Sequence, residues 1–280
     1  MALFITSLNS GSNGNCYYVG NEEDAILVDA GISCREIERR MARLNLSMSR
    51  VKALFISHEH TDHISGAAVL SRKYKLPVYI TPSTIRQAKI HIEKSLQQTF
   101  IADEAITIGS LSITPFVKHH DAIDPFSFMI ACKEIKVGVI TDIGKVCERV
   151  IHYFRQCHAC FLETNCDEKM LDEGGYPIFL KQRIRGGKGH ISNAQALELF
   201  LQHKPPFMSH LLLSHLSKHN NCPQLVHELF KQHADNVQIV VASRYEETQL
   251  FTVTKSMNAS PEEIKQISFV QENIQMTLFG

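Results

Sequence analysis

The chain has 280 residues, 44% of them hydrophobic, and equal numbers of basic and acidic side chains, 29 of each. This length and composition fit one large or two small globular domains with a substantial core. No apolar run reaches the roughly 18 residues of a membrane helix, and the first residues lack the basic region of a signal peptide, so we expect a cytoplasmic protein. The balanced charge neither requires nor excludes a nucleic-acid partner.

Short apolar runs bounded by Gly, Pro and polar residues indicate that strands and helices alternate along the chain. Strands are predicted over residues 3–8, 16–19, 25–29, 51–56, 77–81, 101–117 (interrupted by a turn at Gly109-Ser110), 126–131, 136–141, 159–163, 211–213 and 237–242. Helices are predicted over residues 35–44, 65–74, 193–203 and 224–233, with another that opens at Pro82. A polar, Gly-rich segment covers residues 173–190. The order predicts an α/β domain over residues 1–250, with residues 251–280 as a C-terminal extension.

Two polar loops are candidate substrate contacts. The loop over residues 9–15 joins the first two predicted strands, and its glycines permit tight turns. It is either a plain hairpin connection or a surface whose backbone N–H groups and short side chains, Ser12 and Asn15 among them, face a substrate. A second loop offers Asn220, for which a plain turn is the simpler interpretation. The sequence leaves these alternatives open.

The most informative stretch is the pattern His-x-His-x-Asp-His over residues 58–63, which directly follows a predicted strand. If the chain is still extended there, His58 and His60 point the same way, because side chains alternate. Both can then reach one cation, whereas Asp62 and His63 begin the next helix and can hold a second. Imidazole suits zinc, and a carboxylate extends the choice towards manganese or iron. The alternative, a histidine-rich surface loop, is disfavoured by the strand-to-helix junction.

Further candidate ligands stand at the ends of other predicted strands. His120, Asp142 and His215 each follow such a strand, and active sites of α/β folds collect where strands end. With the four ligands of residues 58–63 they make seven, the number that a two-metal site needs if one carboxylate is shared. Any one of them alone would be weak support, because a single histidine is more often a surface residue than a ligand.

The histidine pattern resembles the metal motif of the metallo-β-lactamase superfamily, and nearly the whole chain is similar to its WalJ/YycJ-type branch. The residues that carry the resemblance to this branch are Ser10-Gly11-Ser12-Asn13-Gly14-Asn15, His120-Asp121-Ala122, Thr141-Asp142-Ile143-Gly144, Glu163-Thr164-Asn165, Gly189-His190-Ile191-Ser192-Asn193 and Ser214-His215-Leu216-Ser217. The resemblance implies an αββα four-layer sandwich with a two-metal site at one edge. It also selects His120 over His119, which should point away because neighbours on a strand alternate.

The resemblance further implies how two divalent ions, zinc or manganese, would be held. The first metal would be bound by His58, His60 and His120, the second by Asp62, His63 and His215, and both would be bridged by Asp142. Asp29, which ends the third predicted strand, would orient the histidine loop from behind. Members of the branch are described as metal-dependent nucleases, so the expected activity is that of a DNA phosphodiesterase, a 5′–3′ exonuclease.

The expected chemistry follows from charge. Two divalent cations lower the pKa of a water between them, so that hydroxide attacks phosphorus near neutral pH while a metal offsets the developing negative charge. Asp62 is expected to orient this water. His190 lies in a segment that resembles the His-Ser-Thr region of ribonuclease Z-type enzymes, so it is the expected proton donor to the leaving group. Alternatively, Ser192 or Asn193 only caps the next helix there, and both interpretations can hold together.

Four cationic side chains lie in residues 181–188, just before His190. Such runs are usually solvent-exposed surfaces, but the neighbouring histidine makes phosphate binding an equal alternative. Arg183, Arg185 and Lys188 are therefore candidate contacts to a DNA backbone. Contacts of this kind depend on salt and do not read sequence.

The last residues contain the pattern Gln-x-x-Leu-Phe, formed by Gln275, Leu278 and Phe279. It resembles the short peptide with which bacterial proteins bind the DNA-polymerase sliding clamp. Such peptides anchor apolar side chains in a groove, and a chain end is accessible for that purpose. The alternative is that Leu278 and Phe279 pack on the domain.

Three classes of function therefore compete. They are a DNA exonuclease, a small-molecule hydrolase of the same superfamily that acts on cyclic phosphodiesters or thioesters, and a non-catalytic metalloprotein. The full ligand set argues against loss of activity. Because the basic segment and the C-terminal peptide favour a nucleic acid, we expect a two-metal DNA nuclease.

Overall fold

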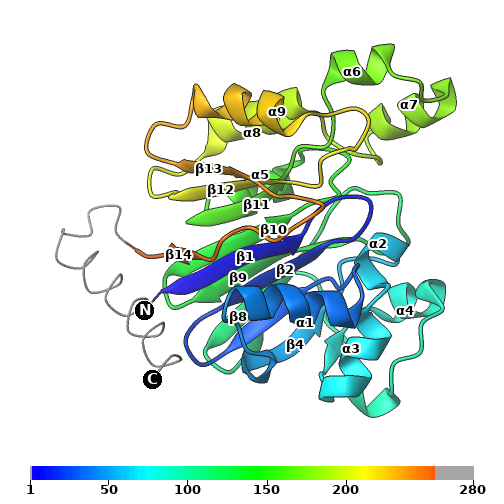
Figure 1. The fold of residues 1–280 in the computed structure, drawn as a ribbon, viewed down its shortest axis with the longest axis vertical. Helices are drawn as coiled ribbons and strands as arrows, with labels where there is room; N and C mark the ends of the chain where they lie inside the picture. The colour runs from blue at the N-terminus through cyan, green and yellow to red at the C-terminus, as the bar shows by residue number, and fades with distance from the viewer. Residues whose placement is uncertain (1, 256–280) are drawn as a thin grey trace.

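The computed structural model describes residues 2–255, which build two seven-stranded mixed sheets packed face to face (Figure 1). The first sheet contains, in spatial order, β14 (Phe251–Val253), β1 (Leu3–Asn9), β2 (Cys16–Gly20), β3 (Ala25–Val28), β4 (Val51–Phe55), β5 (Val78–Tyr79) and β6 (Gln97–Gln98). The second contains β13 (Gln238–Val241), β12 (His210–Ser214), β11 (Ala159–Glu163), β10 (Ile135–Ile140), β9 (Phe126–Cys132), β8 (Leu111–Val117) and β7 (Ile106–Ile108).

Helices cover the outer face of each sheet (Figure 1). The first sheet is covered by α1 (Cys34–Arg43), α3 (Ala67–Tyr74) and α4 (Pro82–Ala88), and the second by α5 (Glu148–Phe154), α8 (Asn193–His203) and α9 (Pro223–Lys231). The other helical segments are α2 (Thr61–Ile64), α6 (Glu168–Glu173), α7 (Ile178–Arg185) and the short 3-10 turns Met48–Arg50 and Lys94–Leu96. Within residues 2–255, no helix has the length and apolarity that crossing a bilayer requires.

The core is divided into layers because side chains of a strand alternate between its two faces. Val28 and Phe55 point inward and meet Phe161 of the opposite sheet in a core between the two sheets. Their neighbours Leu27 and Leu54 point outward and pack under the helices of the first sheet. The αββα sandwich predicted from the sequence is thereby confirmed.

Sheet topology brings the ends of several strands to one edge. β10, β11, β12 and β13 run parallel, and Leu162 of β11 pairs with both Ile140 of β10 and Leu213 of β12. β3 and β4 are also parallel, with Val28 paired to Phe55. Parallel strands finish at the same edge of a sheet, so the residues that follow them gather there.

The end of the domain differs from the sequence-based expectation. Residues 251–253 form β14, which pairs antiparallel with β1 through Leu3 and Val253, instead of starting a C-terminal extension. Phe251 and Val253 are buried, so residues 237–242 do not hold the last core strand. The pairing partner lies at the other end of the chain, which local sequence cannot reveal. The proposed clamp peptide, with Gln275, Leu278 and Phe279, falls outside the described residues.

The polar segment over residues 173–190 also differs from its expected form. It contains α7, which with α6 closes a small core of its own around Leu171 and Ile184. Leu180 and Ile184, one turn apart, are the apolar side chains that turn α7 inward, and charged neighbours mask this short pattern in the sequence. In Figure 1, α6 and α7 stand out from the sandwich beyond the upper helical layer.

Candidate metal centre

All seven predicted ligands come together at the edge where the parallel strands end. Donor atoms within 4.8 Å of one another form three relevant groups, namely His58 with His60 and His120, Asp62 with His63 and His215, and His58 with His63 and Asp142. The first two groups match the division between two metals that family resemblance implies. Asp142 also lies in a further group with His215, so it touches both halves of the cluster.

The first half of the cluster is made of three imidazoles. The Nδ1 atom of His60 lies 3.1 Å from Nε2 of His58 and 3.3 Å from Nε2 of His120. His58 leaves the end of β4, while His120 follows β8 of the opposite sheet. Both sheets therefore contribute to this half.

The second half surrounds two carboxylates. Nε2 of His63 and Nε2 of His215 each lie 3.4 Å from Oδ2 of Asp62. Asp142 stands between the same two rings, with Oδ2 3.4 Å from His63 Nε2 and Oδ1 3.3 Å from His215 Nε2. Its two oxygens thus face different histidines, as a carboxylate between two ions would.

The donor set fits divalent cations. Oδ2 of Asp142 is buried, and its 3.4 Å contact with His63 Nε2 is too poorly directed to be a hydrogen bond. A buried carboxylate oxygen without a partner is costly, and an unpartnered one calls for an ion or another donor. Imidazole nitrogens mixed with carboxylate oxygens suit zinc or manganese. The cluster is therefore able to bind divalent metal.

The backbone at three strand ends adopts the left-handed conformation. The φ angles are 61° at Asp29, 55° at Asp142 and 58° at His215. Asp and His tolerate this region better than most residues, but it still costs energy and persists only where surrounding contacts hold it. Each of the three follows a strand whose end feeds the cluster, so the chain turns sharply at the point where a functional side chain is needed.

The turn that carries Asp62 and His63 packs tightly against the loop after β3. The N–H of Ala30 donates to the carbonyl of His63 at 2.8 Å, and the N–H of Asn15 donates to that of Asp62 at 2.7 Å. A Cβ atom on Gly31 would lie 1.7 Å from the Asp62 carbonyl oxygen. Glycine is thus required at this position for the two loops to meet.

Asp29 holds the histidine loop from behind, as expected from family resemblance. Its Oδ1 accepts the N–H of Ser57 and its Oδ2 the hydroxyl of Ser57, both at 2.8 Å. His63 donates from Nδ1 to the same Oδ2 at 2.7 Å, and Nδ1 of His58 lies 2.8 Å from the Ser57 hydroxyl. These contacts fix both rings with Nε2 directed into the cluster.

Glu163 belongs to the site, although from the sequence it was named only as part of the family resemblance and was assigned no role. It ends β11 and is fully buried. Oε1 lies 2.6 Å from Nδ1 of His190 and 3.3 Å from Nδ1 of His215, while Oε2 accepts the N–H of Ile143 at 2.7 Å. Its position at the end of a strand is the same signal that identified Asp142, so it could have been found.

His190 reaches the cluster, as its expected role requires. Besides its bond to Glu163, its ring stacks on that of His215 with centroids 5.1 Å apart. Ser192 caps α8 by accepting the N–H of Gln195, and the reciprocal bond completes a capping box. The capping interpretation of this segment is confirmed, and it is compatible with the catalytic role of His190, which stays a prediction.

Asn15 lies at the cluster but is buried, so it does not face solvent as a substrate contact would. Its Nδ2 donates to Oδ2 of Asp62 at 3.2 Å, and its Oδ1 accepts the Tyr17 hydroxyl at 3.2 Å. Asn15 therefore helps to position Asp62, one of the predicted ligands. Ser12, at the tip of the same loop, is exposed. Asn220 is 1% exposed, and its side chain makes no hydrogen bond within residues 2–255.

The three basic candidates have different surroundings. Nε of Arg183 donates to Asp121, whose Oδ1 lies 3.4 Å from Nε2 of His120, so Arg183 stands at the rim of the cluster. Arg185 instead contacts α6, pairing with Asp172 at 2.6 Å and donating to the Glu168 carbonyl at 3.1 Å. Lys188 is exposed, and its backbone lies against Gly144, two residues after Asp142.

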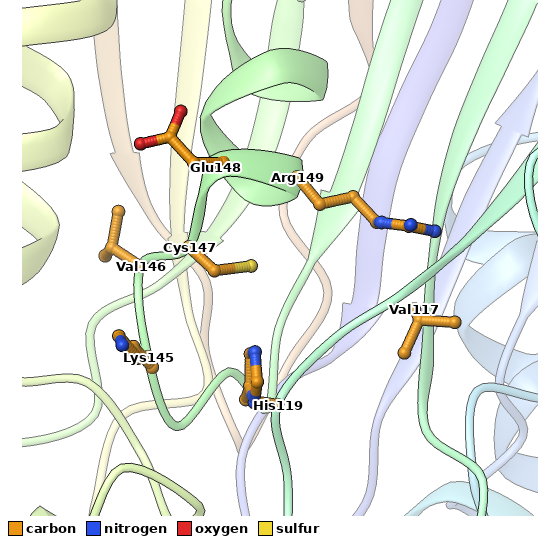
Figure 2. A pocket seen from close by; sticks show the side chains of 7 residues that line it. All are labelled: Val117, His119, Lys145, Val146, Cys147, Glu148 and Arg149. Carbon is orange, nitrogen blue, oxygen red and sulfur yellow. The ribbon is translucent and has the colours of Figure 1, made fainter.

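His119 points away from the cluster, as strand alternation predicts. It is exposed and lines a separate cavity of about 650 Å³ (Figure 2). The other residues that line this cavity are Val117, Lys145, Val146, Cys147, Glu148 and Arg149. None of the clustered His and Asp residues lines this cavity.

Burial and charge act in opposite directions on the clustered histidines. Burial lowers the pKa of His215, but neighbouring carboxylates, Asp142 first among them, outweigh it and raise this pKa to about 10. Burial also lowers the pKa of His63, but Asp142 and Asp29 outweigh it and hold this pKa well above its usual value. Burial dominates at His120, where the pKa falls to about 3. Metal ligation requires neutral rings, so metal affinity is expected to fall as the pH is lowered.

Comparison with known proteins gives a consistent result. A model of the beta-lactamase superfamily domain matches residues 24–216. The exodeoxyribonuclease YycJ of Bacillus anthracis is 35% identical over 229 residues, which cover 80% of this chain and 86% of that protein. The exodeoxyribonuclease WalJ of Streptococcus pneumoniae is 32% identical over 225 residues, which cover 79% and 84%.

Solved structures share the fold at low sequence identity. The metallo-beta-lactamase fold protein YhfI from Bacillus subtilis superposes with a TM-score of 0.70 at 16% identity, over 90% of this chain and 100% of that one. Zn²⁺-bound PqqB from Methylobacterium extorquens gives a TM-score of 0.65 at 14% identity, over 90% and 99%.

Because Asp29 contacts both Ser57 and His63, replacing it is predicted to lower metal affinity. In Asp29→Asn an amide nitrogen, which cannot accept a hydrogen bond, would face the donor groups of Ser57 and His63. The rings of His58 and His63 would then lose their fixed orientation. We expect zinc affinity, measured by isothermal titration calorimetry, to fall about 10- to 100-fold. The matched control is Asp235→Asn, which removes an exposed carboxylate paired with Lys204. Equal affinity in the two variants would contradict the role of Asp29.

Proposed function

The chain belongs to the metallo-β-lactamase superfamily, in its WalJ/YycJ-type branch, and from this premise we propose that it is a two-metal exonuclease acting on DNA. The observation that carries the proposal is the seven-ligand cluster at the strand ends, with Asp142 between its two halves. We further propose that the bound metal is zinc or manganese and that the enzyme digests DNA in the 5′–3′ direction. An exposed cationic side chain at the rim, Arg183, favours a polyanionic substrate over a small molecule.

The two halves of the cluster would hold one metal each. The first would be held by His58, His60 and His120, the second by Asp62, His63 and His215, with Asp142 shared. Bound divalent ions supply Lewis-acid chemistry, because they lower the pKa of water and offset negative charge on a phosphate. The side chain of Asp62 is 21% exposed, whereas that of Asp142 is 2% exposed, so Asp62 is the carboxylate placed to orient the attacking water.

His190 is the proposed proton donor to the leaving oxygen. Its Nδ1 donates to Glu163 at 2.6 Å, which fixes the ring and leaves Nε2 available to a substrate. The side chain is 21% exposed, so it lies at the surface of the cluster rather than beneath it. Glu163 acts through His190 and His215 and is therefore a positioning residue.

The proposed contacts to DNA are Arg183, Lys188 and Ser12, which are all exposed. We also propose that Gln275, Leu278 and Phe279 bind the DNA-polymerase sliding clamp. The proposed location of the protein is the cytoplasm. The clamp contact is supported by sequence alone, because these three residues lie outside residues 2–255.

The proposal is tested by an assay of the metal-reconstituted full chain on end-labelled DNA. We expect stepwise release of nucleotides from one end, with a chelator abolishing it. The Asp62→Ala variant is the control, because it removes a metal ligand and the carboxylate that orients water. Digestion that persists unchanged in this variant, or no digestion by the wild type with zinc or manganese, would contradict the proposal.

The role of His190 is separable from metal binding. His190→Ala removes a side chain that the proposed division leaves outside both metal sites, so bound metal should stay constant while kcat on DNA falls about 10²- to 10⁴-fold. His119→Ala is the matched control, because it removes the neighbouring, outward-facing histidine of the His119–His120 pair. Metal content by elemental analysis and single-turnover rates are the measurements. Unchanged turnover in His190→Ala would remove this residue from the mechanism.

The different surroundings of the two arginines predict different effects on DNA binding. Arg183→Ala should weaken binding and reduce the dependence of log K on log salt by about one phosphate contact. Arg185→Ala breaks an exposed ion pair with Asp172 and should leave both quantities nearly unchanged. Fluorescence anisotropy over a salt series measures both. Equal effects of the two substitutions would show that the rim contact of Arg183 has no part in binding.

A further inference from the structure

The three imidazoles of the first half of the cluster differ in which ring nitrogen faces inward. Nδ1 of His120 lies 3.0 Å from the carbonyl oxygen of Gly189, which can only accept, so Nδ1 carries the ring proton and Nε2 presents a lone pair to the cluster. Nδ1 of His58 is likewise occupied, at 2.8 Å from the Ser57 hydroxyl. His60 is reversed, because its Nδ1 is the atom that lies close to Nε2 of both other rings.

The outer nitrogen of His60 therefore needs an acceptor. A ring that binds a metal through Nδ1 carries its proton on Nε2, and ligating histidines almost always donate their second N–H to a carboxylate, a carbonyl or water. The carboxylate oxygen beside Nε2 of His60 is Oδ1 of Asp121. The two atoms are 3.9 Å apart, which is too long for a hydrogen bond but within reach of a small rotation of either side chain.

Asp121 has one oxygen to offer to this ring. Its Oδ2 accepts the Nε–H of Arg183, whereas Oδ1 is buried and has no hydrogen-bond partner within residues 2–255. A buried carboxylate oxygen without a donor is costly. Oδ1 also lies 3.4 Å from Nε2 of His120, but that nitrogen presents a lone pair and cannot donate. The oxygen that lacks a donor therefore faces the nitrogen of His60 that would need an acceptor.

The loop that carries Asp121 is fixed relative to His60. The N–H of Ile123 donates to Oε1 of Glu59 at 2.9 Å, and Glu59 directly precedes His60 in the chain. Arg183 of α7 holds the carboxylate itself. Asp121 belongs to none of the ligand groups found within residues 2–255, so it stands beside the ligands of the first half and not among them.

We propose that Asp121 is a positioning residue that accepts the Nε2–H of His60 and so keeps Nδ1 of this ring directed at the first metal. Arg183 occupies the other carboxylate oxygen, which leaves Oδ1 for the ring. One carboxylate thus lies between the proposed DNA contact and a ligand of the first metal. The inference rests on the metal centre of the proposed function, and it is independent of the substrate.

Removal of the carboxylate tests the proposal through metal affinity. Asp121→Ala should weaken the binding of one of two zinc equivalents about 10- to 100-fold and leave the other unchanged, because only the His60 ring loses its partner. Isothermal titration calorimetry of the full chain measures both equivalents. Asp172→Ala is the matched control, because it breaks the other carboxylate–arginine pair of α7, the one with Arg185. Unchanged affinity in Asp121→Ala, or equal loss in the two variants, would overturn the proposal.

The proton on the His60 ring is a readout that a merely structural role would not change. In long-range ¹H–¹⁵N NMR spectra of the zinc-loaded full chain, wild-type His60 should show zinc-bound Nδ1 and a protonated Nε2 that exchanges slowly with solvent. In Asp121→Ala the Nε2–H signal should be lost to fast exchange, and the spectrum of His60→Gln assigns the signal. A wild-type ring with zinc on Nε2, or the same Nε2–H signal in Asp121→Ala, would contradict the proposal.

Failure of this inference is distinguishable from failure of the proposed function. Digestion of DNA by the wild type, together with unchanged zinc affinity in Asp121→Ala, would refute the positioning role alone. A wild type that digests no DNA, but whose zinc affinity and His60 signal depend on Asp121 as described, would support the positioning role and refute the nuclease function alone.

Discussion

The structure depends on the pairing of buried carboxylates with histidines. Asp29, Asp142 and Glu163 are at most 1% exposed, and each contacts at least one imidazole. An unpaired buried charge would cost several kcal/mol, so each of these carboxylates needs its imidazole partner in the folded state. His63 illustrates the coupling, because its two ring nitrogens contact Asp29 on one side and Asp142 on the other.

The sandwich provides the scaffold on which these pairs can form. Parallel strands in both sheets end at one edge, and left-handed residues turn the chain there so that short loops deliver one polar side chain each. Rigid strands set the positions, and the loops set the chemistry. The insertion that contains α6 and α7 adds Arg183, which reaches Asp121 at the rim of the first half of the cluster.

Much of the fold and of the ligand cluster could be predicted from the sequence, because candidate ligands at strand ends leave a local pattern. The pattern over residues 58–63 and the residues His120, Asp142 and His215 were all found in this way. Glu163 was assigned no role although it also ends a strand, since a lone Glu is usually solvated. Side-chain direction within loops was not predictable, so Asn15 was expected at a substrate but packs against Asp62. Pairings between distant segments, such as β14 with β1, leave no local signal.

In the proposed metal centre, two divalent cations would bind on either side of Asp142. Anomalous diffraction at the manganese absorption edge, from crystals soaked in Mn²⁺, would locate them. We expect two anomalous peaks per chain, one bounded by His58, His60 and His120 and the other by Asp62, His63 and His215, with Asp142 touching both. A single peak remote from Asp142, or none at saturating metal, would contradict this arrangement.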